Sequence, residues 1–330
     1  RWRNTEATLP GATATYPETI KNSMTNTEIK VGTRGSSLAL RQTDLVVTQL
    51  QSYFPKLTFQ IVIIRTHGDS NPTAPLTGLG LGVFVKEIEQ LLISQDLDMA
   101  VHSLKDLPTL LPEGLGIGAI LDREDPRDVL INRWHCTFDD LPDGARIGTS
   151  SPRRVAQIKE SNPLLNVLPI RGNVETRLSK SNSDDYDGVI LAAAGLQRLG
   201  LDNQISEYLP LKKFVPPPGQ GVLAVEIRND NADIKRILSH IHEPLISAAT
   251  TSERLFLELL GGGCQLPVGA YAQSSGEDLV LDVFMSTSDG DAIFRGNQSG
   301  PGNRPADLAR AAYSDLLEHA DTKLISALTI

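Results

Sequence analysis

The stretch VGTRGSS, residues 31–37, is echoed by IGTSSPRR, residues 147–154, and this repetition decides the fold that the sequence predicts. In both copies a short apolar run ends in Gly-Thr, and serine and arginine follow where a helical pattern begins. Around each copy, continuous apolar runs alternate with amphipathic helical runs, which indicates α/β layers with buried, mostly parallel sheets. We therefore predict two similar α/β lobes.

The rest of the chain sets the expected domain limits. We predict lobe 1 over residues 28–125 and lobe 2 over residues 126–221, with residues 222–240 returning to lobe 1 after the proline-rich run FVPPPGQG. Residues 244–330 hold helical runs around three strand-like runs, which predicts a small C-terminal domain with an antiparallel sheet covered by helices. Residues 1–27 are polar and without periodicity, which predicts a disordered extension.

Composition and charge exclude several classes of protein. The 330 residues carry a formal net charge of −9, which argues against nucleic-acid binding because phosphate contacts leave a basic footprint. No apolar run approaches the roughly 18–20 residues of a membrane-spanning helix, so no membrane partner is expected. Two cysteines, without Cys-x-x-Cys or His-Glu-x-x-His spacing, predict a reducing cytoplasm and no structural metal.

Positive charge is nevertheless concentrated in four stretches, VGTRGSSLALRQ, IGTSSPRRVAQ, IRGNVETRL and LAAAGLQRLG. They contain seven arginines against one acid, Glu175, and most of the arginines follow predicted strand ends, where open α/β sheets bind ligands. Helix N-termini and serine hydroxyls add further donors, and arginine grips carboxylates through paired hydrogen bonds. These stretches predict a cationic cleft between the lobes that accepts a polyanion. The alternative is that the arginines pair with surface acids. A phosphate ligand is less favoured, because no Gly-x-x-x-x-Gly-Lys-[Ser/Thr] occurs.

Two acidic stretches can supply chemistry in such a cleft. In VHSLKDLPT, residues 101–109, Asp106 follows a predicted strand, where its carboxylate can stabilise a developing cation or move a proton. From the stretch alone, a helix-capping or turn carboxylate is an equal interpretation. The run REDPRDVL, residues 123–130, is either an acid–arginine site or a hinge between the lobes, and the proline and alternating charges favour the hinge.

Cys264 lies in ELLGGGCQLPVG, residues 258–269, directly behind three glycines that allow a bulky group to approach closely. A hydrolase-type nucleophile requires a histidine base, and none lies nearby in the sequence. A free structural thiol and an attachment point for a covalent group both remain open, and the glycines favour attachment.

Ten motifs in order, from VGTRGSSLALRQ through THGDS, FVKEIEQLL, VHSLKDLPT, EDPRD, IGTSSPRR, RGNVETRL, LAAAGLQRLG and PGQGVLAVE to GGGCQLPVGAYA, resemble the porphobilinogen deaminase (hydroxymethylbilane synthase) family. The resemblance implies two periplasmic-binding-protein-like lobes with mostly parallel sheets and a small C-terminal α+β domain with a three-stranded antiparallel sheet. It also implies a transferase that deaminates four porphobilinogens and joins them head to tail, releasing the linear tetrapyrrole hydroxymethylbilane. A dipyrromethane cofactor, attached through a thioether to Cys264, primes that chain.

The resemblance also implies roles for individual residues. Asp106 is the catalytic carboxylate that stabilises the cationic azafulvene formed when ammonia leaves. Residues that bind cofactor or substrate are Arg34, Ser36, Gln42, Ser103, Lys105, Thr149, Ser150, Ser151, Arg153, Arg154, Arg171, Asn173, Arg177 and Arg198. Two departures stand near the site: Leu81 where many members carry lysine, and Gly261 where a glutamate is frequent.

Partners and rival functions follow from the same reading. The resemblance implies a cytoplasmic monomer with porphobilinogen as its small-molecule substrate and tetrapyrrole (porphyrin, haem) biosynthesis as its process. The alternative function is a non-catalytic two-lobed anion-binding protein, which leaves Cys264 and the third domain unexplained. A cysteine-dependent transferase or hydrolase is the second rival, and it predicts that alkylation of Cys264 abolishes activity.

Overall fold

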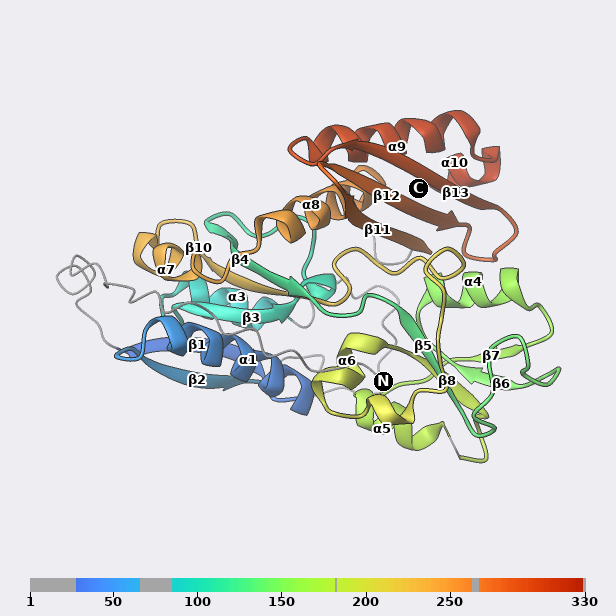
Figure 1. Cartoon of the computed structure of the whole chain (residues 1–330), viewed down its shortest axis with the longest axis horizontal. Helices are drawn as coiled ribbons and strands as arrows, with labels where there is room; N and C mark the ends of the chain where they lie inside the picture. Colours follow the sequence, from blue (N-terminus) through green and yellow to red (C-terminus); the bar gives the residue numbers. More distant parts are fainter. Residues whose placement is uncertain (1–27, 66–84, 182, 263–266, 329–330) are drawn as a thin grey trace, which may run out of the picture.

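The computed structural model describes residues 28–65, 85–181, 183–262 and 267–328 of the chain. Two five-stranded sheets and one three-stranded sheet organise these residues. In Figure 1 lobe 1 (blue to cyan) and lobe 2 (green to yellow) lie side by side, with the C-terminal domain (red) above them. Helix α8 (Pro244–Leu259, in the orange part of the chain) joins lobe 1 to that domain.

The lobe 1 sheet has the strand order β2-β1-β3-β10-β4. Strands β1, β2 and β3 pair in parallel, whereas β10 pairs antiparallel with both β3 and β4, so four of the five strands point the same way. The strands are β1 (Glu28–Arg34), β2 (Thr58–Ile64), β3 (Met99–Ser103), β4 (Leu115–Arg123) and β10 (Val222–Arg228). Their helices are α1 (Ser37–Tyr53), α3 (Lys86–Ile93) and α7 (Ala232–Leu238).

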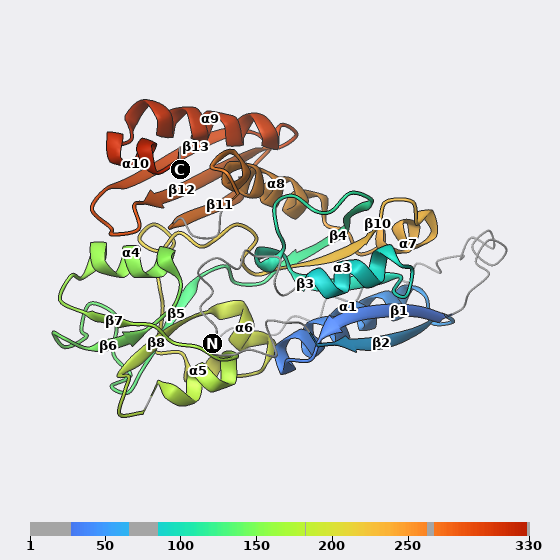
Figure 2. The ribbon, with the colours of Figure 1, turned by 180° about the vertical axis from the view of Figure 1, so that it is seen from behind.

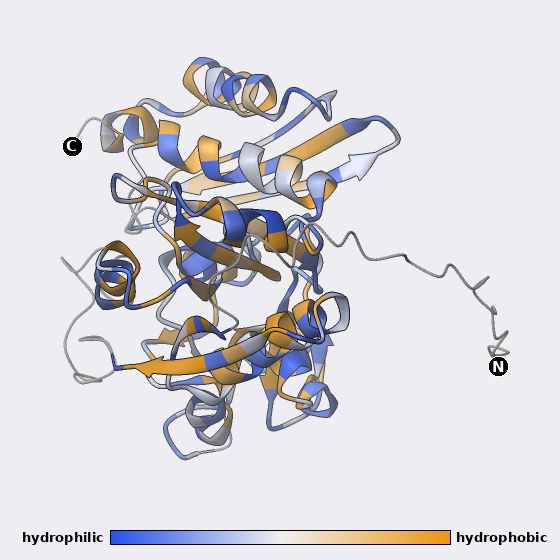
Figure 3. Ribbon diagram, turned by 90° about the vertical axis from the view of Figure 1, so that its left-hand side faces the viewer, coloured by the Kyte–Doolittle hydropathy of each residue, from blue (hydrophilic) through white to orange (hydrophobic). Residues whose placement is uncertain are grey.

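Alternation along β3 shows how this sheet is covered on both faces. Met99 and Val101 pack in the apolar cluster that α1 and α7 complete, whereas Ala100 packs in the cluster that includes Leu92 of α3. Successive strand residues point to opposite faces, so a continuously apolar strand is buried by helices on both sides. Figure 3 shows long orange stretches along the strands and alternating colours on the helices.

The lobe 2 sheet repeats this plan with the order β7-β6-β8-β5-β9. Strand β5 is the reversed strand here, because it pairs antiparallel with β8 and β9 while β6 pairs in parallel with β7 and β8. The strands are β5 (Asp128–Asn132), β6 (Arg146–Gly148), β7 (Asn166–Leu168), β8 (Gly188–Ala192) and β9 (Glu207–Tyr208). The helices are α4 (Pro152–Ser161), α5 (Val174–Lys180) and α6 (Ala193–Arg198), with short 3₁₀ turns η3 (Leu104–Asp106) in lobe 1 and η4 (Asp202–Gln204) in lobe 2.

The chain crosses between the two sheets twice. It leaves lobe 1 after β4, enters lobe 2 at β5, and returns from β9 through residues 209–221 to β10. Each reversed strand is therefore the first strand after a crossing. Two lobes with this strand order are of the periplasmic-binding-protein type, so the predicted fold class is confirmed. In each lobe sheet four of the five strands run in the same direction, but the reversed strand makes two of the four pairings antiparallel, so the sheets are mixed.

The C-terminal domain has the antiparallel order β11-β12-β13, formed by β11 (Val268–Ser275), β12 (Asp278–Ser286) and β13 (Ile293–Pro301). Helices α8, α9 (Pro305–His319) and α10 (Thr322–Ala327) bury one apolar cluster against this sheet. Figure 2 shows from behind that α9 and α10 lie on the far side of the sheet from the lobes. Within the ranges given above, the structure contains no helix both long and apolar enough to cross a bilayer.

Candidate functional site

The predicted site residues come mainly from segments that follow strand ends in both lobes. Lys105 and Asp106 lie in η3, directly after β3, while Arg153 and Arg154 open α4 after β6. Arg177 lies on α5, which follows β7. Parallel strands place their carboxyl ends at one edge of a sheet, which is why segments far apart in the sequence meet there.

Electrostatic coupling joins these residues across the two lobes. Burial lowers the pKa of Lys105 to about 8; Asp106 and Asp128 oppose that shift, and Arg154 and Arg153 add to it. Burial also lowers the pKa of Arg177, where Arg154 and Arg171 act in the same direction and Asp106 opposes. We call this set the inter-lobe cluster; its members are Lys105, Asp106, Asp128, Arg153, Arg154, Arg171 and Arg177. Five cations against two carboxylates leave it with excess positive charge.

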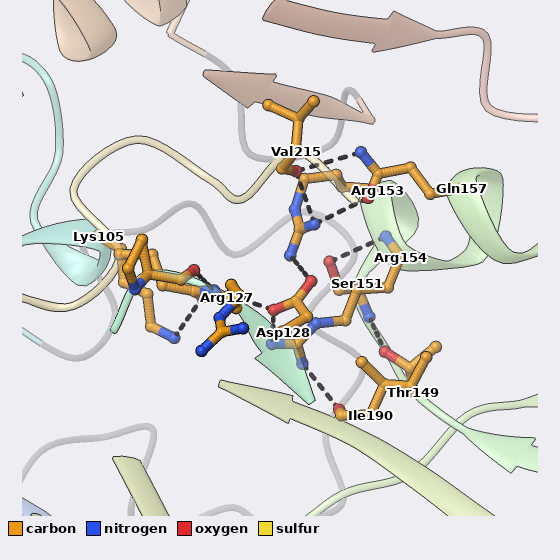
Figure 4. Close-up of polar contacts among 12 residues, drawn as sticks. Lys105, Arg127, Asp128, Thr149, Ser151, Arg153, Arg154, Gln157, Ile190 and Val215 are labelled. Carbon is orange, nitrogen blue, oxygen red and sulfur yellow. Dashed lines mark hydrogen bonds and ion pairs between the residues drawn. The ribbon is translucent and has the colours of Figure 1, made fainter. Parts of the chain in front are cut away.

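Asp128, the first residue of β5, is the fully buried centre of the cluster. Its Oδ2 accepts from Nη2 of Arg153 at 2.8 Å, and its Oδ1 accepts from Nη2 of Arg154 at 2.7 Å. Figure 4 shows the carboxylate between the two guanidinium groups. Burial alone would raise the pKa of Asp128, but the two arginines lower it well below its usual range. One carboxylate thus faces two guanidinium ions, and one positive charge is left uncompensated.

The Nη1 atoms of this arginine pair bond to lobe 2 itself. Nη1 of Arg153 donates to Gln157 Oε1 at 2.9 Å and to the carbonyl of Val215 at 2.8 Å. Nη1 of Arg154 donates to the carbonyl of Ile190 at 2.9 Å. The Nε atoms of both are buried and have no hydrogen-bond partner among the described residues. The sequence suggested a two-bond grip on a ligand carboxylate; in this structure the carboxylate between the pair is Asp128.

Gln220 links Lys105 of lobe 1 to Asp128 of lobe 2. Its Oε1 accepts from Nζ of Lys105 at 3.2 Å, and its Nε2 donates to Asp128 Oδ1 at 2.9 Å and to the carbonyl of Pro126 at 2.7 Å. Gln220 is fully buried in the second crossing segment, and Pro126 lies in the first. A hydrogen-bond chain therefore runs from Lys105 through Gln220 to Asp128, past both crossings.

Arg198 ties α6 to the same crossing segment. Its Nη2 donates to the carbonyl of Gly221 at 2.7 Å, and its buried Nε has no partner within the described part of the chain. Burial lowers the pKa of Arg198 to about 10, and Glu124 opposes the shift. Gly221 has φ +87°, and a Cβ there would stand 2.3 Å from the carbonyl oxygen of Glu124, so only glycine fits.

Several of the polar residues predicted to bind cofactor or substrate form hydrogen bonds within the protein itself. The Oγ atoms of Ser36 and Ser151 accept from the amides of Ala39 and Arg154 and so cap α1 and α4. Oδ1 of Asn173 caps α5 by accepting from Thr176 N at 2.8 Å. These side chains satisfy helix N-terminal amides, which have no partner inside a helix.

The other predicted polar residues support the loops around the cluster. Ser150 Oγ donates to the carbonyl of Ile170 at 2.7 Å and accepts from its amide at 3.0 Å, which fastens the segments after β6 and β7 together. Buried Thr149 accepts from the amide of Ser151 at 3.2 Å. In lobe 1, Gln42 Nε2 donates to Ser103 Oγ at 2.9 Å, and Arg34 is the last residue of β1.

Cys264 and Leu81 lie outside the described residues, but the approach to Cys264 is placed. Gly261 and Gly262 have φ values of +90° and +66°, in the left-handed region that favours glycine over other residues. A Cβ on Gly262 would stand 3.1 Å from Oγ1 of Thr109. The loop that leads to Cys264 therefore starts beside the segment that follows Asp106.

Two family models match the chain: the porphobilinogen deaminase dipyromethane cofactor binding domain over residues 29–236, and the porphobilinogen deaminase C-terminal domain over residues 248–318.

The chain belongs to the porphobilinogen deaminase family.

Relatives support the assignment over nearly the whole length. The porphobilinogen deaminase of Syntrophobacter fumaroxidans is 41% identical over 303 residues, covering 92% of this chain and 98% of the relative. That of Geobacter metallireducens is 45% identical over 291 residues, covering 88% of this chain and 91% of the relative. The resemblance noted in the sequence is thus confirmed, and the family model's name confirms dipyrromethane as the family's cofactor.

Solved structures align at lower similarity. The methionine binding protein MetQ matches with a TM-score of 0.40 and 11% identity, covering 65% of this chain and 90% of that protein. The VFT2 domain of BvgS from Bordetella pertussis matches with a TM-score of 0.41 and 16% identity, covering 65% of this chain and 86% of that domain. At this similarity the fold assignment depends on the strand order described above.

The structure brings together Lys105, Asp106, Arg153, Arg154, Arg171 and Arg177. Sequence reasoning missed Asp128 and Gln220, although both lie in stretches that carried the resemblance, EDPRD and PGQGVLAVE. The available signal was the REDPRDVL run, which was interpreted as a hinge; it contains both a crossing segment and the buried acid.

The described residues contain no group of three or more His, Cys, Asp or Glu side chains that could hold a metal ion.

Proposed function

We propose that this protein is a porphobilinogen deaminase, a transferase that releases hydroxymethylbilane after joining four porphobilinogen units head to tail. The observation that carries the proposal is a cluster of excess positive charge in which Asp106 of lobe 1 acts on Arg177 of lobe 2, and Arg154 of lobe 2 acts on Lys105 of lobe 1. Each pyrrole unit brings an acetate and a propionate, so the substrate and growing chain are polyanions that such a cluster attracts.

The residues present fit a dipyrromethane cofactor. Buried Nε atoms of Arg153, Arg154 and Arg198 have no partner in the described ranges, and the cluster holds uncompensated positive charge. A buried guanidinium donor without an acceptor is costly, and ligand carboxylates would supply acceptors. We assign the holding of the cofactor and substrate carboxylates to Lys105 and to Arg34, Arg153, Arg154, Arg171, Arg177 and Arg198. The cofactor, when bound, supplies the pyrrole terminus that is extended.

Asp106 is assigned the catalytic role. When ammonia leaves the aminomethyl group of porphobilinogen, the remaining azafulvene is cationic, and a fixed carboxylate nearby stabilises that charge more in the transition state than in the substrate. The same carboxylate accepts hydrogen bonds from pyrrole N–H groups and holds them in register.

Cys264 is assigned as the attachment point of the cofactor through a thioether. The support is the Gly-rich approach described above, with Gly262 beside Thr109 of the segment that follows Asp106. We also propose a cytoplasmic enzyme that acts without nucleic acid, on the basis of the sparse cysteines and the net charge of −9. The proposal that it is a monomer rests on the family resemblance alone.

Intact mass spectrometry tests the proposal. We expect purified protein to exceed its chain mass by two linked pyrrole units, and Cys264→Ser protein to lack the excess. Cys136→Ser is the matched control, since Cys136 is a free thiol in lobe 2, and it should keep the excess. Porphobilinogen is then added. No mass gain and no ammonia release would contradict the proposal and favour a two-lobed anion-binding protein.

A further inference from the structure

Arg254, on α8, donates hydrogen bonds to the backbone of the segment that carries Asp106. Its Nη1 donates to the carbonyls of Leu104 and Leu107 at 3.5 and 3.2 Å, and its Nη2 donates to those of Pro108 and Thr109 at 2.6 and 3.3 Å. All four acceptors lie within residues 104–109. A single side chain from the C-terminal domain therefore bonds four backbone carbonyls of the turn that begins at η3.

This segment has little regular structure of its own to hold it. Leu104 and Leu107 are buried in an apolar cluster with Val85 and Val222, which fixes the inner side of the turn. The carbonyls on its other side are bonded by the Arg254 guanidinium. That group is planar and presents five donors in a rigid fork, so it can serve several carbonyls at once where a lysine ammonium has only three donors at one point.

Helix α8 is itself firmly anchored one residue earlier. Glu253 is fully buried; its Oε1 accepts from Nη2 of Arg123 at 2.7 Å and from the amide of Ala272 at 2.8 Å. Its Oε2 accepts from the amide of Gly219 at 2.7 Å. These partners come from β4, from β11 and from the second crossing segment. The helix is thus fixed to both neighbouring domains before Arg254 reaches the Asp106 segment.

The C-terminal end of α8 leads directly to the loop of Cys264. Gly262 follows the helix and lies beside Thr109, the last residue whose carbonyl Arg254 bonds. One rigid helix therefore holds the start of the cysteine loop at its end and the Asp106 segment at its middle. The distance between those two features depends on the Arg254 contacts.

We infer that Arg254 is a positioning residue for the reaction: it fixes Asp106 relative to the loop that carries the cofactor. This inference rests on the proposed function. Because Arg254 bonds only backbone carbonyls in the contacts above, it acts through Asp106 and not on substrate carboxylates. Its loss therefore lowers kcat, since a misplacement of about 1 Å costs up to ~100-fold in rate, while KM, set by the cluster cations, changes little.

Steady-state kinetics of the holoenzyme with porphobilinogen test the inference, with Arg254→Gln and Arg254→Lys compared with wild type. We expect kcat to fall by roughly 10- to 100-fold in Arg254→Gln with KM within about threefold, and a smaller loss in Arg254→Lys. Arg310→Gln is the matched control, because Arg310 lies on α9 of the same domain, is exposed and pairs with Asp307. Unchanged kcat in both Arg254 variants, or a loss confined to KM, overturns the inference.

A double-mutant cycle separates positioning from general destabilisation. If Arg254 acts through Asp106, Arg254→Gln adds less than about threefold to the kcat loss already caused by Asp106→Glu, which displaces the carboxylate by one methylene. If the kcat loss of the double variant equals the product of the losses of the two single variants, the inference is overturned. Should Arg254→Gln fail to accumulate as folded protein, the cycle is run with Arg254→Lys under the same criterion. Wild-type protein that consumes no porphobilinogen refutes the proposed function instead, and Ehrlich's reagent reports that separately.

Discussion

Replacing Asp128 by asparagine removes the one carboxylate that faces both Arg153 and Arg154, with almost no change in side-chain volume. The two ion pairs, at 2.8 and 2.7 Å, join side chains that are at most 8% exposed. Asparagine can still accept one hydrogen bond, but it leaves two guanidinium ions buried side by side without a counter-charge. Removing one partner of a buried pair costs about 3–5 kcal/mol, because the remaining charge stays desolvated.

That cost is large compared with a typical stability of about 5–15 kcal/mol. For a unit of 150–250 residues each kcal/mol lowers Tm by about 2–4 °C, so we expect a loss of at least about 6 °C. Because the arginines outweigh burial and lower the pKa of Asp128, its stabilising effect is fully present above the unfolded carboxyl pKa of about 3.9. It disappears only as the pH falls through the lowered value. The difference in stability between wild type and variant should therefore be constant from pH 5 to 8.

Calorimetry and urea unfolding of wild type and Asp128→Asn at pH 5, 6, 7 and 8 provide the measurement. Asp125→Asn is the matched control, since Asp125 is three residues earlier and pairs with the partly exposed Arg127. A pair at the surface contributes about 0.2–1 kcal/mol, so the control should lose little. Equal losses in the two variants, or a stabilised Asp128→Asn protein, would refute the view that Asp128 holds the arginine pair by charge.

Three further predictions concern other buried charges. Burial, then the charge of Glu226, raises the pKa of Glu89, so ionisation of Glu89 destabilises the fold as the pH rises. Glu89→Gln should therefore be more stable than wild type at pH 8 and equal to it at pH 4 in urea titrations. Glu253→Gln places an NH₂ donor against a backbone donor such as the amide of Gly219, and should lose about 3–5 kcal/mol in thermal unfolding. Burial lowers the pKa of Lys105 to about 8, so Lys105 loses most of its positive charge between pH 7 and 9. The affinity of primer-free Cys264→Ser protein for porphobilinogen, measured by calorimetric titration, should therefore fall roughly tenfold over that range. The affinity should stay constant when Lys105→Arg is added to this variant.

Each of these has an outcome that would contradict it. Stability of Glu89→Gln below wild type at pH 8 would mean that the carboxylate is needed in charged form. Wild-type stability in Glu253→Gln would show that the three contacts of Glu253 contribute no net free energy. A fall in affinity that persists in the Lys105→Arg protein would assign the titration to another group.

The fold was predictable because its signals are local. The runs VGTRGSS and IGTSSPRR each mark a strand, a turn and a helix start, and the continuous apolar runs between them predict strands buried on both faces. The structure has these elements as β1 with α1 and β6 with α4. The reversed direction of β10 and β5 is not encoded in either strand's own hydropathy, because pairing direction depends on where the chain crosses between the lobes.

The site was predictable as a set of charges but not as a set of contacts. The excess of arginines in four stretches indicated a cationic region, and the structure brings Arg177 near Asp106, and Arg153 and Arg154 near Lys105. Asp128 pairs with arginines 25 and 26 residues away, and no local pattern distinguishes such a buried acid from a hinge acid. Arg254 carried no signal either, since its partners are backbone carbonyls, which every sequence has.

The late return of the chain to lobe 1 affects how the protein is made. Strand β3 ends at Ser103, but its neighbour β10 begins at Val222, after all of lobe 2. A ribosome adding about 5–20 residues per second needs on the order of ten seconds to cover that interval. The strands of lobe 2 run consecutively from Asp128 to Tyr208, so all of them are synthesised before β10 completes the sheet of lobe 1. The nascent lobe 1 meanwhile displays an open strand edge, the kind of surface that chaperones cover.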